Sequence, residues 1–405
     1  METSCDIAVI GGGPAGLAAA ERIAQNDLSV IVFEEHDTIG KPLACGEGMS
    51  VAKLQELELI KEDSNPESCP FVRKQVPIQR FFFGDNSVCT SRLDTVLIDR
   101  VHFDRTLANN AEAAGADIRT GCSVKEIHLS ANAAIVEFQR KGVSKKEEVE
   151  ARIVIACDGP ASRSVKQIFP EIQSQFVQAV EYKMDGIFTD ALEFYFDPKL
   201  TPWGYGWVFP KGNETNVGIV IRPGRNPREQ LNQFVKKVYG NAGRTRAKVK
   251  AQIAGTIPAS GPLKHTVANR FLVAGDAGGF TNPLFYGGIA IAVHTGRLAA
   301  DVAVHAIQTK SETVETLRLY EKKWRQMPYA HPSLQRAHQI FYHELDDTDI
   351  ENIGILLDNL DIEKMGIGST LRIGWRLLRN RIFYSKFKRY RQLTEGFAIT
   401  RDWSF

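Results

Sequence analysis

Residues 6–34 read DIAVIGGGPAGLAAAERIAQNDLSVIVFE, and this stretch decides the fold. A short apolar run ends in three consecutive glycines, an alanine-rich segment follows, and a second apolar run ends at Glu34. The order predicts a strand, a glycine turn, a helix and a second strand, which is the βαβ unit of dinucleotide-binding domains. Gly11, Gly13 and Gly16 occupy the three glycine positions of that pattern.

Each glycine has a physical reason in such a unit. Gly11 permits a sharp turn, Gly13 lets the backbone approach a pyrophosphate, and Gly16 lets the helix and strand pack closely. The helix that follows would turn its free N–H groups and its dipole toward the anion. Glu34, about 20 residues further on, would accept hydrogen bonds from a ribose hydroxyl group. The unit alone does not distinguish FAD from NAD.

The composition is that of an ordinary globular protein. The chain has 405 residues, of which 43% are hydrophobic and 24% charged, so two or three domains are expected and disorder is not. No run approaches the ~18 apolar residues of a membrane span, and the amino terminus enters a strand too early for a signal peptide. Six scattered cysteines without a CxxC pair are typical of a reducing cytoplasm, and none lies after Cys157. The carboxyl-terminal half therefore holds no cysteine-ligated iron–sulfur cluster, and we expect no metal site.

Further elements of a nucleotide-binding domain are predicted at a distance from the first unit. Their apolar patterns indicate a helix over 100–114, a strand over 153–156, a strand over 271–274 and a helix over 288–306. The 153–156 strand follows three predicted strands of a meander, over 124–129, 134–138 and 147–152. Residues 171–252, which lie between these elements, read mostly as strands and aromatic loops. One fold with insertions therefore explains the order better than two domains in series.

Three separated motifs resemble those of FAD-dependent oxidoreductases built like p-hydroxybenzoate hydroxylase: the 6–34 unit, Asp158-Gly159 after a strand, and Gly275-Asp276 before a helix. The resemblance implies that Asp276 binds a ribityl hydroxyl group and that the helix after it turns its amino end to the flavin and pyrophosphate. Arg100 opens a segment, RVHFDRTL, that resembles the family's RxxFDxxL motif. By this resemblance Arg100 contacts the flavin side of the dinucleotide, and the cofactor is FAD.

Two further motifs resemble those of the prokaryotic, archaeal-type geranylgeranyl reductases, the digeranylgeranylglycerophospholipid reductase family. Residues 45–48, CGEG, resemble a loop of these enzymes, and residues 202–210, PWGYGWVFP, match their PxxYxWxFP motif at every specified position. Residues 275–289 are also close to the branch's pattern, with Tyr286 where a small residue would be equally expected. The resemblance implies reduction of isolated double bonds in isoprenoid chains of lipids, with the 202–210 motif lining a long hydrophobic cavity.

With this resemblance we predict an α/β protein: a Rossmann-type FAD-binding domain with an inserted antiparallel β-sheet substrate domain and a helical C-terminal region. The predicted boundaries are 1–70, 93–170 and 266–330 for the FAD-binding domain, 71–92 and 171–265 for the substrate domain, and 331–405 for the helical region. The insert includes a hairpin whose strands cover 78–83 and 87–90 around a turn.

The motifs also give a set of candidate contacts. The predicted cofactor contacts are Gly11, Gly13, Ala15, Gly16, Glu34, Glu35, Cys45, Gly46, Arg100, Asp158, Gly159, Gly275, Asp276, Gly287, Gly288 and Ile289. The predicted substrate contacts are Tyr205, Trp207, Phe209 and Pro283. The three aromatic residues alternate along the chain, so in a strand they would share one face. Asp158 could equally be a turn residue after a strand.

Reduction of an unactivated alkene requires a hydride donor, a proton source and a dry site. Cys45, Glu47 and Tyr205 are the candidate proton donors, and the sequence does not choose among them. Cys45 could also form a redox-responsive pair with another cysteine or be an inert buried thiol. Glu47 could orient its loop or be solvated. His102 could be a catalytic acid, although a histidine at the start of a helix more often caps it.

The net charge of +2 is unevenly distributed, with eight basic residues and no acidic residue between Arg372 and Arg391. Within residues 371–393 the bases alternate with aromatic and aliphatic side chains, as at the surface of an anionic bilayer; a solvated basic face and a nucleic-acid site are the alternatives. We expect a monomer that acts on a prenyl lipid at the inner, cytoplasmic face of the membrane, without nucleic acid. The electron donor would be NAD(P)H or a ferredoxin-like carrier.

Three other functions fit the same fold. A flavin-dependent aromatic or prenyl monooxygenase would consume oxygen, and an electron-transfer flavoprotein–quinone type dehydrogenase would pass electrons to quinone. The CGEG loop and the 202–210 motif argue against the first, and the lack of cysteines after residue 157 argues against iron–sulfur forms of the second. A flavoprotein without catalytic turnover is the third.

Overall fold

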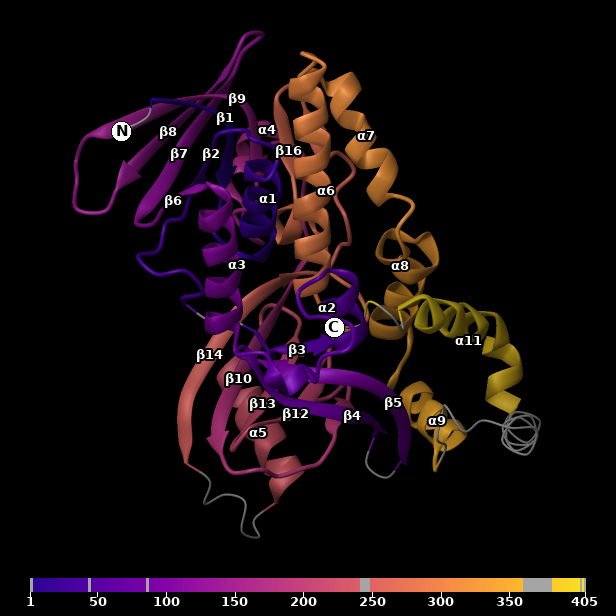
Figure 1. The fold of residues 1–405 in the computed structure, drawn as a ribbon. Helices are drawn as coiled ribbons and strands as arrows, with labels where there is room; N and C mark the ends of the chain where they lie inside the picture. Colours follow the sequence, from indigo (N-terminus) through magenta and orange to yellow (C-terminus); the bar gives the residue numbers. More distant parts are fainter. Residues whose placement is uncertain are drawn as a thin grey trace.

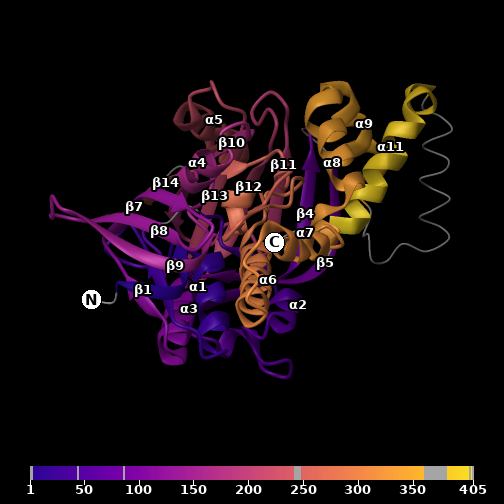
Figure 2. The same cartoon turned by 90° about the horizontal axis from the view of Figure 1, so that it is seen from above.

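The computed structural model describes residues 3–42, 45–84, 87–240, 248–359, 381–400 and 403. Two eight-stranded sheets organise these residues. In Figure 1 sheet A, which contains the amino-terminal strand, lies in the upper half of the molecule and sheet B in the lower half. Figure 2 shows the carboxyl-terminal helices grouped beside sheet B, away from the strands of sheet A.

Sheet A is parallel at its centre, with the order β16-β9-β1-β2-β6. β15 pairs antiparallel with β16 at one edge, and β8, which carries β7, pairs antiparallel with the first half of β9. Its strands are β1 (Ser4–Ile10), β2 (Val30–Phe33), β6 (Asp117–Arg119), β7 (Cys122–Leu129), β8 (Ala134–Arg140), β9 (Lys146–Ala156), β15 (Val267–Ala268) and β16 (Phe271–Val273). The central strands are buried on both faces, which is why they read as continuous apolar runs.

The predicted βαβ unit is present, with helix α1 (Pro14–Ala24) between β1 and β2. Two of its glycines are required by close approach. Gly11 has a φ of +104°, and a Cβ there would lie 2.3 Å from the carbonyl oxygen of Cys157. A Cβ on Gly16 would lie 2.0 Å from the carbonyl oxygen of Gly11. A side chain at either position would push the turn away from its neighbours.

The prediction for β9 was wrong in one respect. We expected one strand over 147–152 and a second over 153–156, but Lys146–Ala156 is a single strand. Its first half pairs antiparallel with β8, and its second half pairs parallel with β1. Burial alternates in the first half and is continuous in the second, because only the second half is covered on both faces. In the sequence, this change from alternating to continuous apolar residues resembles a boundary between two strands.

Sheet B follows the order β14-β10-β13-β12-β11-β4-β5-β3 and is antiparallel except between β4 and β11. Its strands are β3 (Gly48–Ser50), β4 (Val72–Phe83), β5 (Ser87–Ile98), β10 (Phe176–Asp185), β11 (Leu192–Phe196), β12 (Gly206–Lys211), β13 (Glu214–Ile221) and β14 (Val249–Pro258). The hairpin of β4 and β5 is longer than predicted, and the predicted boundary at residue 92 falls inside β5. Three consecutive aromatic pairs join β4 to β11 across the parallel pair, the first being Phe81 stacked on Phe194.

Helices cover both sheets and form the carboxyl-terminal region. They are α2 (Val51–Glu56), α3 (Arg100–Ala114), α4 (Arg163–Ile168), α5 (Pro227–Tyr239), α6 (Ile289–Gln308), α7 (Val314–Trp324), α8 (Pro332–Gln339), α9 (Asp347–Leu357) and α11 (Arg381–Thr400), with short turns at η1 (Pro66–Ser68), η3 (Gly275–Gly278), η4 (Pro328–Ala330) and η5 (Ile340–Glu344). Helices α1 and α6 pack against each other and against strands of sheet A. Helix α5 packs against β10 and β13 of sheet B.

The predicted basic and aromatic segment, 371–393, is only partly described. Residues 371–380 lie outside the described residues, and 381–393 belong to α11. Tyr390 and Leu393 are buried, and the Tyr390 hydroxyl donates to Asp349 Oδ1 at 3.1 Å. These two side chains therefore pack inward against the helical region instead of facing outward. In the described part of the chain, no helix has the length and apolar character that a membrane span requires.

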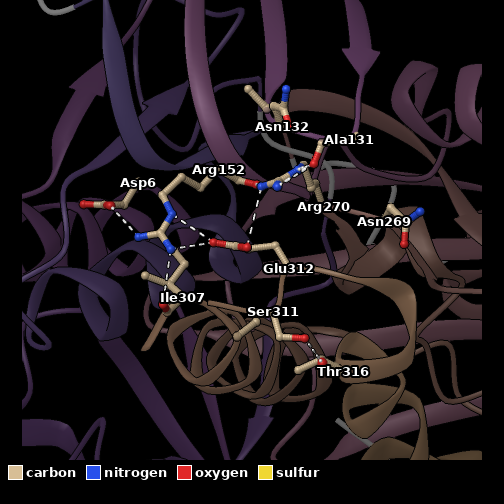
Figure 3. A network of polar contacts seen from close by, with 12 residues as sticks. Asp6, Ala131, Asn132, Arg152, Asn269, Arg270, Ile307, Ser311, Glu312 and Thr316 are labelled. Atoms are coloured by element: carbon tan, nitrogen blue, oxygen red, sulfur yellow. Dashed lines mark hydrogen bonds and ion pairs between the residues drawn. The ribbon is translucent and has the colours of Figure 1, made fainter. Parts of the chain in front are cut away.

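A network of ion pairs joins the amino ends of the sheet A strands (Figure 3). Arg152 of β9 binds Glu312 through two guanidinium nitrogens, Nε at 2.9 Å and Nη2 at 2.5 Å, and its Nη1 lies 3.5 Å from Asp6. Arg270 donates to the carbonyl oxygen of Arg152 at 3.0 Å and lies 3.8 Å from Glu312. Because ligands of parallel sheets bind at the carboxyl ends of the strands, this network is structural.

Candidate active site

Two adjoining cavities lie beyond the carboxyl ends of the sheet A strands. The first, which we call the sheet A cavity, has a volume of about 400 Å³, and the described residues that line it belong to segments around sheet A. The second, the inter-sheet cavity, has a volume of about 240 Å³ and lies between sheet A and the strands β10, β12, β13 and β14 of sheet B. Gly13, Arg100, Cys157 and Gly159 line both, so the two form one continuous site.

The sheet A cavity is lined by seven of the residues predicted to contact the cofactor. They are Gly11, Gly13, Glu34, Glu35, Arg100, Asp158 and Gly159. Glu34 follows β2, and its Oε2 accepts a hydrogen bond from the Gly12 N–H at 2.8 Å. Its Oε1 accepts from the His36 N–H at 2.8 Å. The carboxylate is therefore fixed at the edge of the glycine turn, where a ribose hydroxyl group could donate to it.

The two helix amino termini at the site are free to bind an anion. Gly13 is the N-cap of α1 and Gly288 the N-cap of α6, and neither helix has a side-chain cap. A Cβ on Gly13 would meet no atom within 4 Å, so this position opens onto the cavity. Uncapped N–H groups beside open space are the arrangement that a pyrophosphate requires. The residues present thus fit a dinucleotide such as FAD.

Asp158 lines the sheet A cavity, but its carboxylate already has partners. Its Oδ1 accepts from the Ser162 hydroxyl at 2.6 Å, and its Oδ2 accepts from the N–H and the hydroxyl of Ser164. These bonds hold the start of α4 beside the strand end. The turn role that the sequence also allowed for Asp158 therefore accounts for its hydrogen bonds.

Arg100 and Asp276 lie where the two cavities meet sheet A. Arg100 is held by Asp104 through two hydrogen bonds of 2.9 and 3.0 Å. Asp276 follows β16 and lines the inter-sheet cavity beside Gly288, where a Cβ would lie 3.3 Å from Asp276 Oδ1. Burial raises the pKa of Asp276 to about 6, and the Arg100 charge opposes that rise. Ala15 and Ile289 line the same wall.

The opposite wall of the inter-sheet cavity is aromatic. Tyr205, Trp207 and Phe209 are all buried and all line it, as their alternation along one face predicts. Trp207 lies over Gly218 of β13, where a Cβ would lie 2.1 Å from the ring atom Cζ2. Glycine is the residue that leaves room for this ring.

Tyr286 extends the aromatic wall, although the sequence left its role open. It has a φ of +55°, lines the inter-sheet cavity, and its ring is nearly parallel to those of Tyr205 and Tyr342. Its hydroxyl donates to the carbonyl oxygen of Trp203 at 2.8 Å. A large aromatic ring therefore occupies space at one end of the cavity that a small residue would leave open.

The CGEG loop contributes Cys45 and Gly46 to the inter-sheet cavity but directs Glu47 away from it. The Glu47 Oε2 accepts hydrogen bonds from Lys211 at 2.6 Å, Lys183 at 2.8 Å and Asn216 at 3.0 Å. Burial alone would raise the pKa of Glu47, but the two lysines outweigh it and hold the pKa below its usual value. The structure thus shows Glu47 as an ionised anchor of its loop, which is the orienting role that the sequence offered beside that of proton donor.

Cys45 is a free thiol at the edge of the inter-sheet cavity. Its sulfur accepts a hydrogen bond from the Glu47 N–H at 3.2 Å. Burial raises the pKa of Cys45, although the nearby Arg100 charge acts in the opposite direction. A protonated thiol is therefore expected at neutral pH, not a reactive thiolate.

Several predicted site residues line neither cavity. Gly16 and Gly275 pack backbone against backbone or against Ala15, and Gly287 and Pro283 lie in the loop before α6 without lining the space. His102 also lies outside both cavities, close to Asp99, whose side chain caps α3. These residues shape or support the site without forming its walls.

Sequence reasoning missed Glu181, which lies on β10 in the wall of the inter-sheet cavity. It also missed Lys183 and Lys211, the partners of Glu47. The signal was present, because charged residues at alternate positions of an otherwise buried strand must point to one side of the sheet. What the pattern could not give was which cavity lay on that side.

The Tyr205 hydroxyl donates to the carbonyl oxygen of Phe285 at 2.5 Å, and burial raises the pKa of Tyr205 well above its usual value. For Tyr205→Phe we expect the free energy of unfolding to fall by about 1–3 kcal/mol, because a buried carbonyl loses its donor. Turnover should fall less than about tenfold, since the hydroxyl is already engaged. Urea unfolding and product formation measure the two effects. A hundredfold loss of turnover at unchanged stability would identify Tyr205 as the proton donor.

Comparisons with known proteins add an independent line of observation. A family model described as an FAD binding domain matches residues 4–259. A digeranylgeranylglycerophospholipid reductase of Methanothrix thermoacetophila is 29% identical over 393 residues, covering 92% of this chain and 96% of the relative. Digeranylgeranylglycerophospholipid reductase 1 of Methanococcoides burtonii is 30% identical over 390 residues, covering 91% of each chain.

Solved structures show the same fold. A geranylgeranyl bacteriochlorophyll reductase-like protein from Thermoplasma acidophilum superposes with a TM-score of 0.82 at 22% identity, covering 96% of this chain and 100% of that one. A p-nitrophenol 4-monooxygenase from Pseudomonas putida superposes with a TM-score of 0.67 at 17% identity, covering 94% and 100%. At these identities the likeness concerns the fold alone, which supports different reactions.

Proposed function

The chain belongs to the FAD binding domain family and, with relatives along nine-tenths of its length, to the digeranylgeranylglycerophospholipid reductase family, and from this membership we propose its function. It is an FAD-dependent oxidoreductase that saturates C=C double bonds in the isoprenoid chains of a geranylgeranyl lipid or a related prenyl compound. The observation that carries the proposal is the inter-sheet cavity, where the wall predicted for the cofactor faces the aromatic wall of β12.

The cavity suits this reaction because its two walls differ in chemistry. On one side lie the uncapped amino ends of α1 and α6, Asp276 and Arg100, which would hold FAD. On the other side Tyr205, Trp207 and Phe209 present buried aromatic surface that excludes water and accepts an apolar chain. Reduced FAD supplies a hydride when bound, and the protein must orient the alkene and provide a proton.

The finer assignments also belong to this proposal. Electrons would come from NAD(P)H or a ferredoxin-like carrier. The sequence contains no second complete GxGxxG motif, so it does not indicate a dedicated NAD(P)H-binding domain. The enzyme would be a monomer that meets its substrate at the inner face of the membrane, through basic residues of 371–393. Arg389 and Arg391 of α11 have exposed side chains and would contribute to this contact, although they lie 3.5 Å from Glu344 and 3.4 Å from Glu395. Stronger flotation with anionic than with neutral vesicles would test it.

The function is tested by reducing the flavin of the purified protein chemically without air and adding one prenyl compound at a time. Geranylgeranyl phospholipid, geranylgeranyl diphosphate and geranylgeraniol are incubated in parallel, and the products are analysed by mass spectrometry. We expect a mass increase of two hydrogen atoms for each reduced double bond. Free reduced FAD without protein is the control. A product that gains oxygen when air is admitted would indicate a monooxygenase, and unchanged prenyl compounds would overturn the proposal.

The environment of Cys45 predicts its reactivity. Because burial raises its pKa, we expect iodoacetamide to alkylate Cys45 more slowly at pH 7 than it alkylates an unstructured cysteine peptide. The rate should increase as the pH rises toward 9, when the thiolate forms. Peptide mass spectrometry measures the modified fraction at Cys45 over time. A rate at pH 7 above that of the peptide would instead indicate a stabilised thiolate.

A further inference from the structure

Glu181 is a buried carboxyl group that no described neighbour satisfies. Its residue is 2% exposed, and its side chain lines the inter-sheet cavity. Within the described part of the chain, neither carboxyl oxygen has a partner at hydrogen-bond geometry. The indole N–H of Trp207, which is also unpaired at that geometry, lies close enough to the carboxyl group to lower its pKa. Burial of a polar group without a partner costs free energy, and natural proteins keep such groups mainly where they serve a function. The buried carboxyl group of Glu181 is therefore a candidate to bind a ligand or to take part in a reaction.

The strand register directs Glu181 into the cavity. It is opposite Gly218 of β13, which in turn is opposite Trp207 of β12, so Glu181 and Trp207 flank a position without a side chain. The alternate residues Val180 and Tyr182 pack in the cluster around α5 on the other side of the sheet. Glu181 therefore shares the cavity side of sheet B with the aromatic residues of β12.

The wall opposite Glu181 belongs to sheet A and its helices. Gly13, Asp276, Gly288 and Ile289 line that wall, and they are the residues proposed to hold FAD. An alkene bound between the two walls would have the cofactor wall on one side and Glu181 on the other. Hydride and proton can then reach the two alkene carbons from opposite sides.

Burial, more than any nearby charge, keeps the proton of Glu181 on the carboxyl group. Together with the nearby Glu47 carboxylate, burial raises the pKa of Glu181 to about 8. Lys183 of the same strand and Lys211 of β12 act in the opposite direction, but both bind Glu47 directly. At neutral pH the group is therefore mainly a neutral carboxylic acid, the form that a proton donor requires.

We propose that Glu181 is the proton donor for the reduction, an inference that rests on the proposed function. The O–H bond of Glu181 breaks as the π electrons of the alkene take its proton and form one new C–H bond. The hydride that the proposed reaction already requires forms the second C–H bond at the other carbon. The carboxylate that remains recovers a proton from water before the next turnover. One double bond, one hydride and one proton give one saturated bond.

The direct test is Glu181→Gln, which keeps the size of the side chain and removes the acidic proton. We expect turnover of the prenyl compound to fall by about 100-fold or more, the scale of general acid catalysis, with normal flavin content. Asp185→Asn is the matched control, because Asp185 lies on the same strand with a half-exposed side chain. If Glu181→Gln retains more than a third of wild-type turnover, the proposal is wrong.

A second measurement detects the protonation state of Glu181 and does not require turnover. In the infrared spectrum of the wild-type protein we expect a carbonyl band of a protonated carboxyl group that disappears as the pH rises through about 8. Glu181→Gln should lack this band, and Asp185→Asn should keep it. A wild-type spectrum at pH 7 that does not change on Glu181→Gln would overturn the proposal even without an active assay.

The two measurements separate this inference from the proposed function. A wild-type protein that reduces no prenyl compound overturns the proposed function, whereas an active wild type with an equally active Glu181→Gln overturns only the role of Glu181. If the glutamine variant does not fold, Glu181→Asp provides the test, because it retains an acid one methylene shorter. We expect reduced but measurable turnover for the aspartate, which falls as the pH rises through the pKa of its carboxyl group. Full wild-type turnover across that range would contradict the proposal.

Discussion

Gly13→Val should yield a folded protein without flavin. The Gly13 backbone is extended, with a φ of −86°, so valine can adopt its conformation. A Cβ at this position meets no protein atom within 4 Å and projects into the space that both cavities share. The branched side chain would occupy the place of the pyrophosphate at the amino end of α1. We expect affinity for FAD to fall by more than about 100-fold, the equivalent of roughly 3 kcal/mol.

The absorbance of the purified protein near the flavin bands and titration of the apoprotein with FAD measure this loss, and circular dichroism checks the fold. Gly13→Ala is the graded control, with a single methyl group and a smaller expected loss. Gly16→Val is the opposite control, because a Cβ there would lie 2.0 Å from the Gly11 carbonyl oxygen and should disturb folding itself. Normal flavin content in Gly13→Val would mean that the dinucleotide does not cross the turn at Gly13.

Glu47→Ala should be strongly destabilising. The side chain is fully buried and lies between the ammonium groups of Lys183 and Lys211, which are 12% and 5% exposed. Removal of the carboxylate leaves two buried positive charges without their partner, for which we expect a loss of about 3–5 kcal/mol in the free energy of unfolding. Flavin content and turnover should fall as well, because the same side chain holds the loop that carries Cys45.

Urea unfolding at pH 7 measures the effect. Glu137→Ala is the matched control, because Glu137 pairs with the exposed Lys146 at 2.6 Å, where solvent screens the pair and its removal should cost far less. The pKa of Glu47 is held below its usual value, so its contribution is present at neutral pH and is lost only as the pH falls below that usual value. Equal losses for the two variants would show that the buried cluster is no stronger than a surface pair.

The sequence predicted those features that depend on local spacing. The strand, turn, helix and strand of 6–34 were correct because close backbone contacts require glycine at Gly11 and Gly16, and such contacts leave a fixed pattern. Tyr205, Trp207 and Phe209 line one cavity because they alternate along the chain, and their contact with the substrate stays a prediction. The continuous strand β9 was missed because its burial changes where its partner changes from β8 to β1.

Features that join distant parts of the chain could not be predicted. Glu47 binds Lys211, which lies 164 positions further along the chain. The sequence of the CGEG loop does not indicate that partner. The same holds for Glu181, which lines the same cavity as Asp276 only because sheet B packs against the end of sheet A. The sequence indicated a loop position for Glu47 and did not single out Glu181, and only the packing of the two sheets gives each carboxyl group the surroundings that set its pKa.

The contact between Trp207 and Gly218 limits the order in which this cavity can change during evolution. A side chain at 218 would overlap the indole ring, since a Cβ there lies 2.1 Å from Cζ2. During evolution, Trp207 must therefore first be replaced by a smaller residue, which leaves a cavity, before any residue larger than glycine can appear at position 218. Afterwards the tryptophan cannot return without the reverse step. Tryptophan at 207 and glycine at 218 should consequently be inherited together. A protein engineer who wishes to change the shape of this wall must make the two substitutions in the same order.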